Sequence, residues 1–99
     1  MAYNVDMNDL KFQLFDWLDL DSILESPVFA DWDRENIEMV LAEALKIAQE
    51  QFDPANEPGD REGVKLQDGR VTVPAVYQEP YKTLAEGGWV GCVNSPEYG

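Results

Sequence analysis

The chain has no histidine and a single cysteine, Cys92, among its 99 residues. The commonest metal ligand and general acid–base side chain is therefore absent. One cysteine excludes an internal disulfide, a cysteine-rich zinc site and, without histidine, a cysteine–histidine nucleophile. We expect Cys92 to be a buried, inert thiol in a protein of the reducing cytoplasm.

Basic residues and long apolar runs are also scarce. Seven Lys and Arg stand against 20 Asp and Glu, which gives a net charge of −13. Such a surface repels phosphate backbones and anionic membranes, so we expect neither nucleic acid nor a membrane as partner. No apolar run approaches the about 20 residues of a membrane span, and the N-terminal sequence lacks the features of a signal peptide.

Helical periodicity is the clearest pattern that is present, and it predicts three helices, over 8–18, 33–52 and 76–86. In the first, an apolar stripe leaves Phe12 and Phe15 to one side, which is typical of a helix buried on two sides, either deep within its own small domain or by a partner surface outside this chain. The members of this stripe are Met7, Leu10, Leu14, Trp17 and Leu18. The second helix has a longer stripe, consisting of Ile37, Val40, Leu41, Ala44, Leu45, Ala48 and Phe52.

Composition also predicts where these helices end. Asp6 or Asn8 is suited to cap the first helix, and 19–29 is expected to be a connector with one helical turn. Asp53-Pro54 interrupts the second stripe, and 56–62 is expected to be a loop because it is rich in Asn, Pro and Gly. Gly87 and Gly88 end the third helix through a left-handed residue.

A β-hairpin is predicted from strands at 64–66 and 70–73, joined through Asp68-Gly69. Two strands alone are marginal in water, so the hairpin must lie against something else. The fold class is therefore mainly α, with about three helices and a small hairpin, as part of a larger fold.

The segment from Asp31 to Asn36 begins like a calcium-binding loop. Its third ligand position holds Glu35, and Asn36 stands where such a loop needs glycine. Ala42 occupies the position of the bidentate glutamate. We therefore interpret Asp31 or Asp33 as a helix cap.

The other carboxylates do not indicate a particular catalytic or metal-binding site either. Asp16, Asp19 and Asp21 are interpreted as a solvated acidic edge, and the Asp and Glu of the helices as polar faces. The Gly87–Gly91 stretch does not have the spacing of a phosphate-binding loop. From the residues alone we assign no catalytic, cofactor-binding or metal-binding residue.

The second half of the chain contains five motifs in a characteristic order. They are Gly59-Asp60-Arg61-Glu62-Gly63, Asp68-Gly69-Arg70-Val71-Thr72-Val73-Pro74, Tyr77-Gln78-Glu79-Pro80-Tyr81, Ala85-Glu86-Gly87-Gly88-Trp89-Val90-Gly91 and Pro96-Glu97-Tyr98-Gly99. In this order and at these spacings the chain resembles the N-terminal segment of acyl-CoA dehydrogenases. The nearest branch is the larger bacterial one with an extended N-terminus, which is 3-methylmercaptopropionyl-CoA dehydrogenase-like. Cys92, Asn94 and Ser95 depart from the usual small or apolar choices.

The resemblance implies an oxidoreductase that uses FAD to desaturate acyl-CoA thioesters. A carboxylate base takes the α-proton, and the β-hydride passes to the flavin. In this family those parts lie downstream, so the segment itself is expected to be inactive and to bind neither FAD nor acyl-CoA. Residues 1–30 would be an extension helix and connector, and 31–99 would carry the long helix, hairpin, third helix and tail.

The expected partners are the remainder of the dehydrogenase chain or its subunits, or a second copy through exposed apolar helix faces. The alternative is a free-standing acidic interaction module that binds a basic protein, as an antitoxin or a nucleic-acid mimic does. A third reading, a hydrolase with paired acids, rests only on the abundance of carboxylates.

Overall fold

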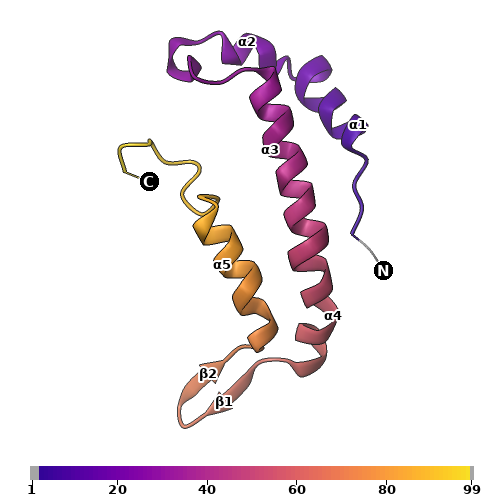
Figure 1. Ribbon diagram of the computed structural model, residues 1–99, viewed down its shortest axis with the longest axis vertical. Helices are drawn as coiled ribbons and strands as arrows, with labels where there is room; N and C mark the ends of the chain where they lie inside the picture. Colours follow the sequence, from indigo (N-terminus) through magenta and orange to yellow (C-terminus); the bar gives the residue numbers. More distant parts are fainter. Residues whose placement is uncertain (1–2, 99) are drawn as a thin grey trace. The chain divides into compact units, whose positions relative to one another are not determined.

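The computed structural model describes residues 3–98. These residues form two units, one of Tyr3–Lys46 and one that starts at Ile47 and takes in the rest of the described chain. Helices dominate both units, and the described strands form a two-stranded antiparallel hairpin (Figure 1). The expected fold class, mainly α with a small hairpin, is confirmed.

The first predicted helix is present as α1 (Met7–Lys11), which continues into the π-helical turn η1 (Phe12–Trp17). Its cap is Asp6, whose carboxylate accepts hydrogen bonds from the backbone N–H groups of Asn8 at 3.0 Å and Asp9 at 3.3 Å. The connector that follows contains α2 (Leu20–Leu24) and the 3-10 turn η2 (Pro27–Phe29).

The apolar stripe expected on the first helix is wrong in part. Phe15, which falls off that stripe, is the buried residue at 5% exposure, whereas Trp17 is 71% and Leu18 55% exposed. The cause is the π-helical turn η1, which inserts an extra residue per turn and so shifts the buried face away from the regular spacing.

The second predicted helix is confirmed as α3 (Arg34–Ile47) followed by the π-helical turn η3 (Ala48–Phe52). The helix does not end at Asp53-Pro54, however. It continues as α4 (Asp53–Glu62), so the loop expected over 56–62 is wrong.

Two features allow α4 to form against its composition. Pro54 lies in the first turn after η3, where a missing N–H is tolerated. Farther along, Ala55 and Gly59 are buried, and Gly59 lies against the Tyr77 ring. Packing of this face stabilises the helix in spite of Pro58 in its interior.

The hairpin consists of β1 (Lys65–Gln67) and β2 (Arg70–Thr72), paired so that Leu66 lies opposite Val71. The turn residues Asp68 and Gly69 have φ of 50° and 76°. Positive φ at both central residues is the signature of the tight turn that Asp-Gly favours, so the predicted hairpin is confirmed.

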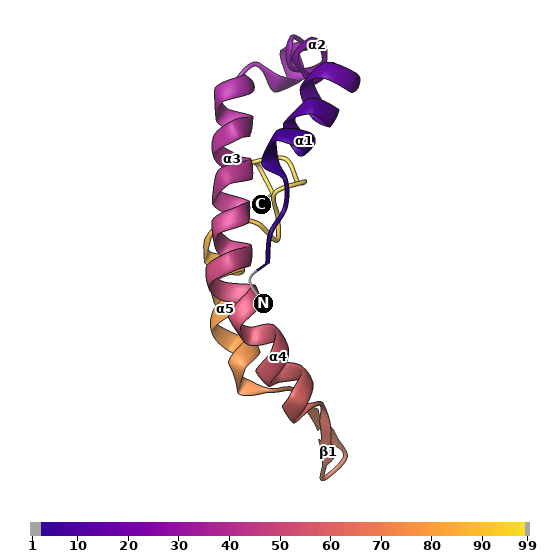
Figure 2. The same cartoon turned by 90° about the vertical axis from the view of Figure 1, so that its right-hand side faces the viewer.

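The third predicted helix is also confirmed. The 3-10 turn η4 (Ala75–Tyr77) leads into α5 (Gln78–Glu86), which contacts η3 and η4 within the second unit (Figure 2). Pro80 is buried in the first turn of α5. Gly88, with φ of 79°, is the left-handed residue after the helix.

Little of the apolar surface is buried. Among the described residues, the buried hydrophobic side chains are Phe15, Ile47 and Ala55. In this part of the chain, no helix is both long enough and apolar enough to cross a membrane.

Candidate functional site

The calcium-like segment is a helix cap. The Asp33 carboxylate accepts a hydrogen bond from the Asn36 backbone N–H at 2.8 Å, and the Asn36 side-chain carbonyl accepts one from the Asp33 N–H at 3.1 Å. This reciprocal pair satisfies two backbone donors at the start of α3, as a capping box does. The prediction of a cap is confirmed, with Asp33 as the residue.

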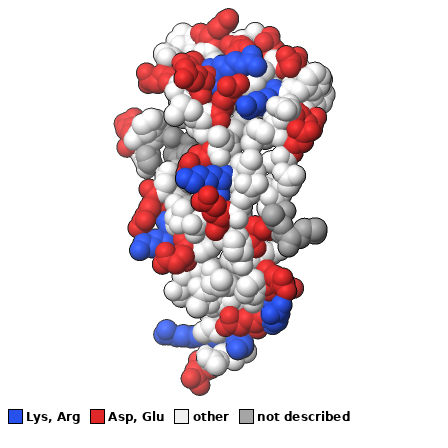
Figure 3. Space-filling model, turned by 45° about the vertical axis from the view of Figure 1, so that its right-hand side comes forward, with Lys and Arg blue, Asp and Glu red and all other residues white. Residues whose placement is uncertain are grey.

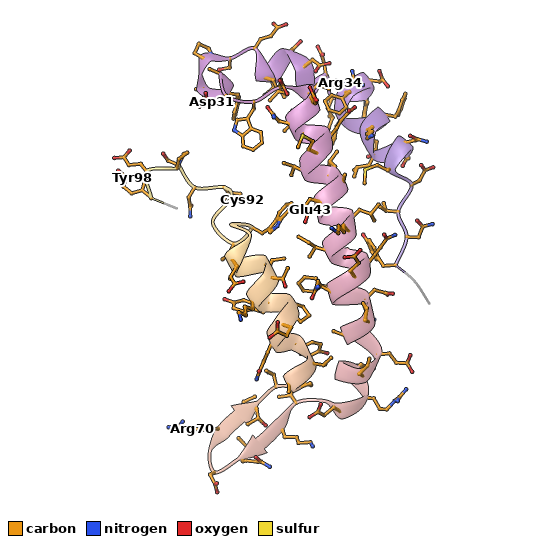
Figure 4. All side chains as sticks on the ribbon, in the orientation of Figure 1. Asp31, Arg34, Glu43, Arg70, Cys92 and Tyr98 are labelled. Carbon is orange, nitrogen blue, oxygen red and sulfur yellow. The ribbon has the colours of Figure 1, made fainter. Side chains whose placement is uncertain are left out.

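The acidic edge beside this cap is held by local contacts. Asp19 accepts a hydrogen bond from the Ser22 hydroxyl at 2.6 Å, and Asp21 forms an ion pair with Arg34 at 3.5 Å. Asp16 is exposed, as are the Asp31 and Glu43 side chains labelled in Figure 4. Among the described residues, no group of three or more Cys, Asp or Glu is placed to hold a metal ion.

Arg34, although its side chain is half exposed, contacts several neighbouring elements of the first unit. Its guanidinium lies 4.2 Å from the centroid of the Phe15 ring and also pairs with Glu38 at 3.5 Å. A cation over an aromatic face is attracted by the ring quadrupole. Arg34 thus joins η1, α2 and the start of α3, which is a structural role.

The expectation of a buried Cys92 is wrong. The thiol is exposed and free, in the irregular segment after α5 (Figure 4). The reason is local: residues 89–98 form successive turns that bury no side chain in the described structure. The expectation depended on the general preference of cysteine for the protein interior. Residues 89–98 form no packed interior in which the thiol could be buried.

The glycine-rich stretch after α5 closes the helix. A Cβ at Gly87 would lie 2.9 Å from Cδ1 and 3.0 Å from Nε1 of Trp89. The Trp89 N–H donates to the Leu84 carbonyl at 3.2 Å, which continues the helix-end hydrogen bonding. The Trp89 indole therefore lies against Gly87, whereas a Cβ at Gly88 would meet nothing within 4 Å.

Among the described residues, no buried polar side-chain atom lacks a hydrogen-bond partner. We assign no part of a flavin reaction to any residue of this chain.

Apolar surface is what the structure offers instead, and the hairpin shows it most clearly. Val64, Leu66, Val71 and Val73 are 65%, 73%, 67% and 60% exposed. Alternation along the strands places these four on one side, which we call the apolar face of the hairpin. The opposite side carries Lys65, Gln67, Arg70 and Thr72.

The helices add further exposed apolar side chains. In the first unit these include Phe12, Trp17, Val28, Trp32 and Met39. On the face shown in Figure 3, uncharged surface is interspersed with acidic groups, and basic groups are few. Exposed apolar area on this scale is typical of surfaces that contact another polypeptide.

Comparison with known proteins gives three relatives. Two butyryl-CoA dehydrogenases of Syntrophomonas wolfei subsp. wolfei are each 30% identical over 90 residues, which cover 87% of this chain and 15% of the relative. The 3-methylmercaptopropionyl-CoA dehydrogenase of Ruegeria pomeroyi is 24% identical over 102 aligned positions, covering 100% of this chain and 17% of the relative.

The chain therefore spans about a sixth of the length of the curated relatives it matches. No family model and no solved structure matches it. The resemblance expected from the sequence is confirmed: this chain is similar to part of acyl-CoA dehydrogenases, over a length that fits an N-terminal segment of that family.

Proposed function

We propose that this chain is the N-terminal helical segment of an FAD-dependent acyl-CoA dehydrogenase, which desaturates acyl-CoA thioesters. Residues 1–30 form its extension helix and connector, and 31–99 form the long helix, hairpin, third helix and tail. The observation that carries the proposal is that three relatives named acyl-CoA dehydrogenases match 87–100% of this chain.

The role of the segment is to pack on the rest of the dehydrogenase, either the continuing chain or other subunits. Its sparse core and exposed apolar side chains support this role, because such surface is stabilised when another polypeptide covers it. FAD and acyl-CoA belong to the whole enzyme, and the segment has no activity of its own. Its work in fatty acid metabolism takes place in the cytoplasm, where the exposed Cys92 thiol stays reduced.

The test compares two polypeptides. The 99-residue chain, mixed with FAD and butyryl-CoA, is expected to show neither flavin absorbance after gel filtration nor acyl-CoA oxidation. The complete gene product that contains these residues is expected to show both. A complete product without bound flavin and without acyl-CoA oxidation would refute the proposal, and an active, yellow 99-residue chain would refute the claim that the segment is inert.

A free-standing acidic interaction module is the second candidate. The unit of Tyr3–Lys46 favours it, because this unit carries eleven Asp and Glu but three Lys and Arg. Such a surface binds a basic protein with an affinity that falls steeply as salt screens the charges. This candidate would be favoured over the first if the chain binds a basic protein tightly and in a salt-sensitive way, and if the complete gene product has no dehydrogenase activity.

A further inference from the structure

We propose that the apolar face of the hairpin, Val64, Leu66, Val71 and Val73, is the surface by which this segment docks onto the catalytic part of the larger polypeptide. This inference rests on the proposed function and adds to it the residues that make the contact. The two sides of the hairpin differ completely in chemistry.

The apolar face holds no charge. Lys65 and Arg70 lie on the opposite side by strand alternation, and Asp68 lies in the turn. Figure 4 shows the Arg70 side chain projecting away from the strands. Covering the apolar face therefore removes no charged group from water, so the desolvation cost that opposes burial of charged surface does not arise.

Nothing described in the second unit covers this face, since its four side chains are at least 60% exposed. Within that unit the hairpin extends beyond the ends of α4 and α5 (Figures 1 and 2). An isolated two-stranded hairpin is marginal in water at best. The sequence nevertheless favours the hairpin strongly, through the tight Asp68-Gly69 turn and the regular alternation of apolar and polar residues along the strands. This indicates that another surface covers the apolar face in the folded protein.

A second copy of this chain is a poor occupant. At roughly 60–120 Å² for each apolar side chain, inferred from the free energy of burying one, four side chains supply about 300 Å². A stable complex of separate proteins buries about 800 Å² per partner. Two copies with a charge of −13 each also repel one another.

The covalently linked remainder of a dehydrogenase is a better occupant. The matched stretch makes up 15–17% of the relatives, so most of each relative lies outside it. A tethered surface acts at a high effective concentration and avoids much of the entropy lost when separate proteins associate. A contact too small for two free proteins is therefore sufficient within one chain, provided that the facing surface is apolar.

Two double variants test this, each replacing one cross-strand pair by serine. Leu66→Ser with Val71→Ser changes the apolar face, and Gln67→Ser with Arg70→Ser is the matched control on the polar face. The readout is the rate of trypsin cleavage after Lys65, in the complete gene product and in the 99-residue chain. We expect the apolar-face pair to accelerate cleavage about tenfold in the complete product, the control pair to leave it within about twofold, and neither to matter in the 99-residue chain.

A second measurement needs no substitution. Carbene labelling of Leu66 and Val71 in the unmodified proteins is expected to fall at least about fivefold on going from the 99-residue chain to the complete product, while Gln67 labelling stays the same. Equal labelling of Leu66 and Val71 in both proteins overturns the docking proposal, even if the variants fail to fold.

The outcomes separate this inference from the proposed function. If the complete product oxidises acyl-CoA but the apolar-face pair leaves cleavage unchanged, the docking surface is wrong and the proposed function stands. The same acceleration in both polypeptides would mean that the pair only weakens the hairpin, which also overturns docking. If the 99-residue chain forms a dimer in which Leu66 is protected from carbene labelling, the apolar face contacts a second copy of the chain, and the docking proposal is wrong. A complete product with no flavin and no dehydrogenase activity removes the proposed function and this inference with it.

Discussion

The Tyr77 ring lies directly on Gly59. A Cβ added at Gly59 would fall 2.2 Å from both Cζ and the hydroxyl oxygen of Tyr77 and 2.4 Å from Cε1. Gly59 is in the interior of α4, and Tyr77 ends the turn η4 that follows the hairpin. Because Gly59 has no side chain, α4 and η4 can approach each other. Glycine is normally unfavourable in the interior of a helix, but here it makes the contact.

Gly59→Ala is expected to lower the thermal midpoint, because the Tyr77 ring must swing out and the packing between α4 and η4 is lost. We expect a net destabilisation of about 1–2 kcal/mol. In a Tyr77→Ala background the sign reverses: the clash is gone, and Gly59→Ala stabilises α4 by about 0.5–1 kcal/mol through its helix propensity. Thermal unfolding followed by circular dichroism measures both. The same sign in the two backgrounds would mean that Tyr77 does not restrict Gly59.

Asp33→Ala is expected to destabilise the first unit by about 1 kcal/mol, because it removes the cap of α3 and its reciprocal hydrogen bonds with Asn36. Asp31→Ala is the control, since Asp31 is exposed, and a change within about 0.5 kcal/mol is expected. Urea unfolding monitored by helical circular dichroism gives both values. Calcium is expected to shift neither midpoint, and a calcium-dependent loss confined to Asp33→Ala would contradict the assignment as a cap.

Phe15→Ala should cost about 3 kcal/mol, because it removes a side chain that is 5% exposed and also the ring over which Arg34 lies at 4.2 Å. Phe12→Ala, on the same helix, removes a ring that is 58% exposed and should cost less than about 1 kcal/mol. The comparison is made by chemical unfolding of the 99-residue chain. Reversed magnitudes would show that Phe12, and not Phe15, is the buried ring of this helix.

Cys92 is expected to react with a thiol reagent such as Ellman's reagent almost as fast in the native chain as in urea, within about threefold, because the side chain is exposed and no described contact shields it. If the thiol reacts more than about a hundredfold more slowly in the native chain than in urea, Cys92 is buried, as the sequence predicted. Both rates are measured at the same pH, because the thiolate is the reactive form.

Local chemistry made much of this fold predictable. Asp6 and Asp33 mark helix starts, Asp68-Gly69 marks a two-residue turn, and Gly88 follows the last helix, because each acts on backbone atoms within a few residues. These signals located the starts of the three helices and the hairpin to within a few residues.

The errors lie where distant residues decide the outcome. The composition of 56–62 indicates a loop, yet Tyr77, far along the chain, packs on Gly59 and stabilises a helix there. The π-helical turns η1 and η3 have no local signature, and η1 moved burial from the expected stripe to Phe15. The sequence predicted exposed apolar helix faces and a hairpin that must lie against something else. Which side chains of the hairpin are exposed, namely Val64, Leu66, Val71 and Val73, comes from the structure.

Asp53–Glu62 is a helix with two prolines and a glycine, so it has little tendency to coil by itself. Its helical conformation depends on packing against Tyr77, which follows the hairpin in the sequence. Separating the turn η4 from α4, and with it Tyr77 from Gly59, is therefore expected to unwind this stretch next to η3.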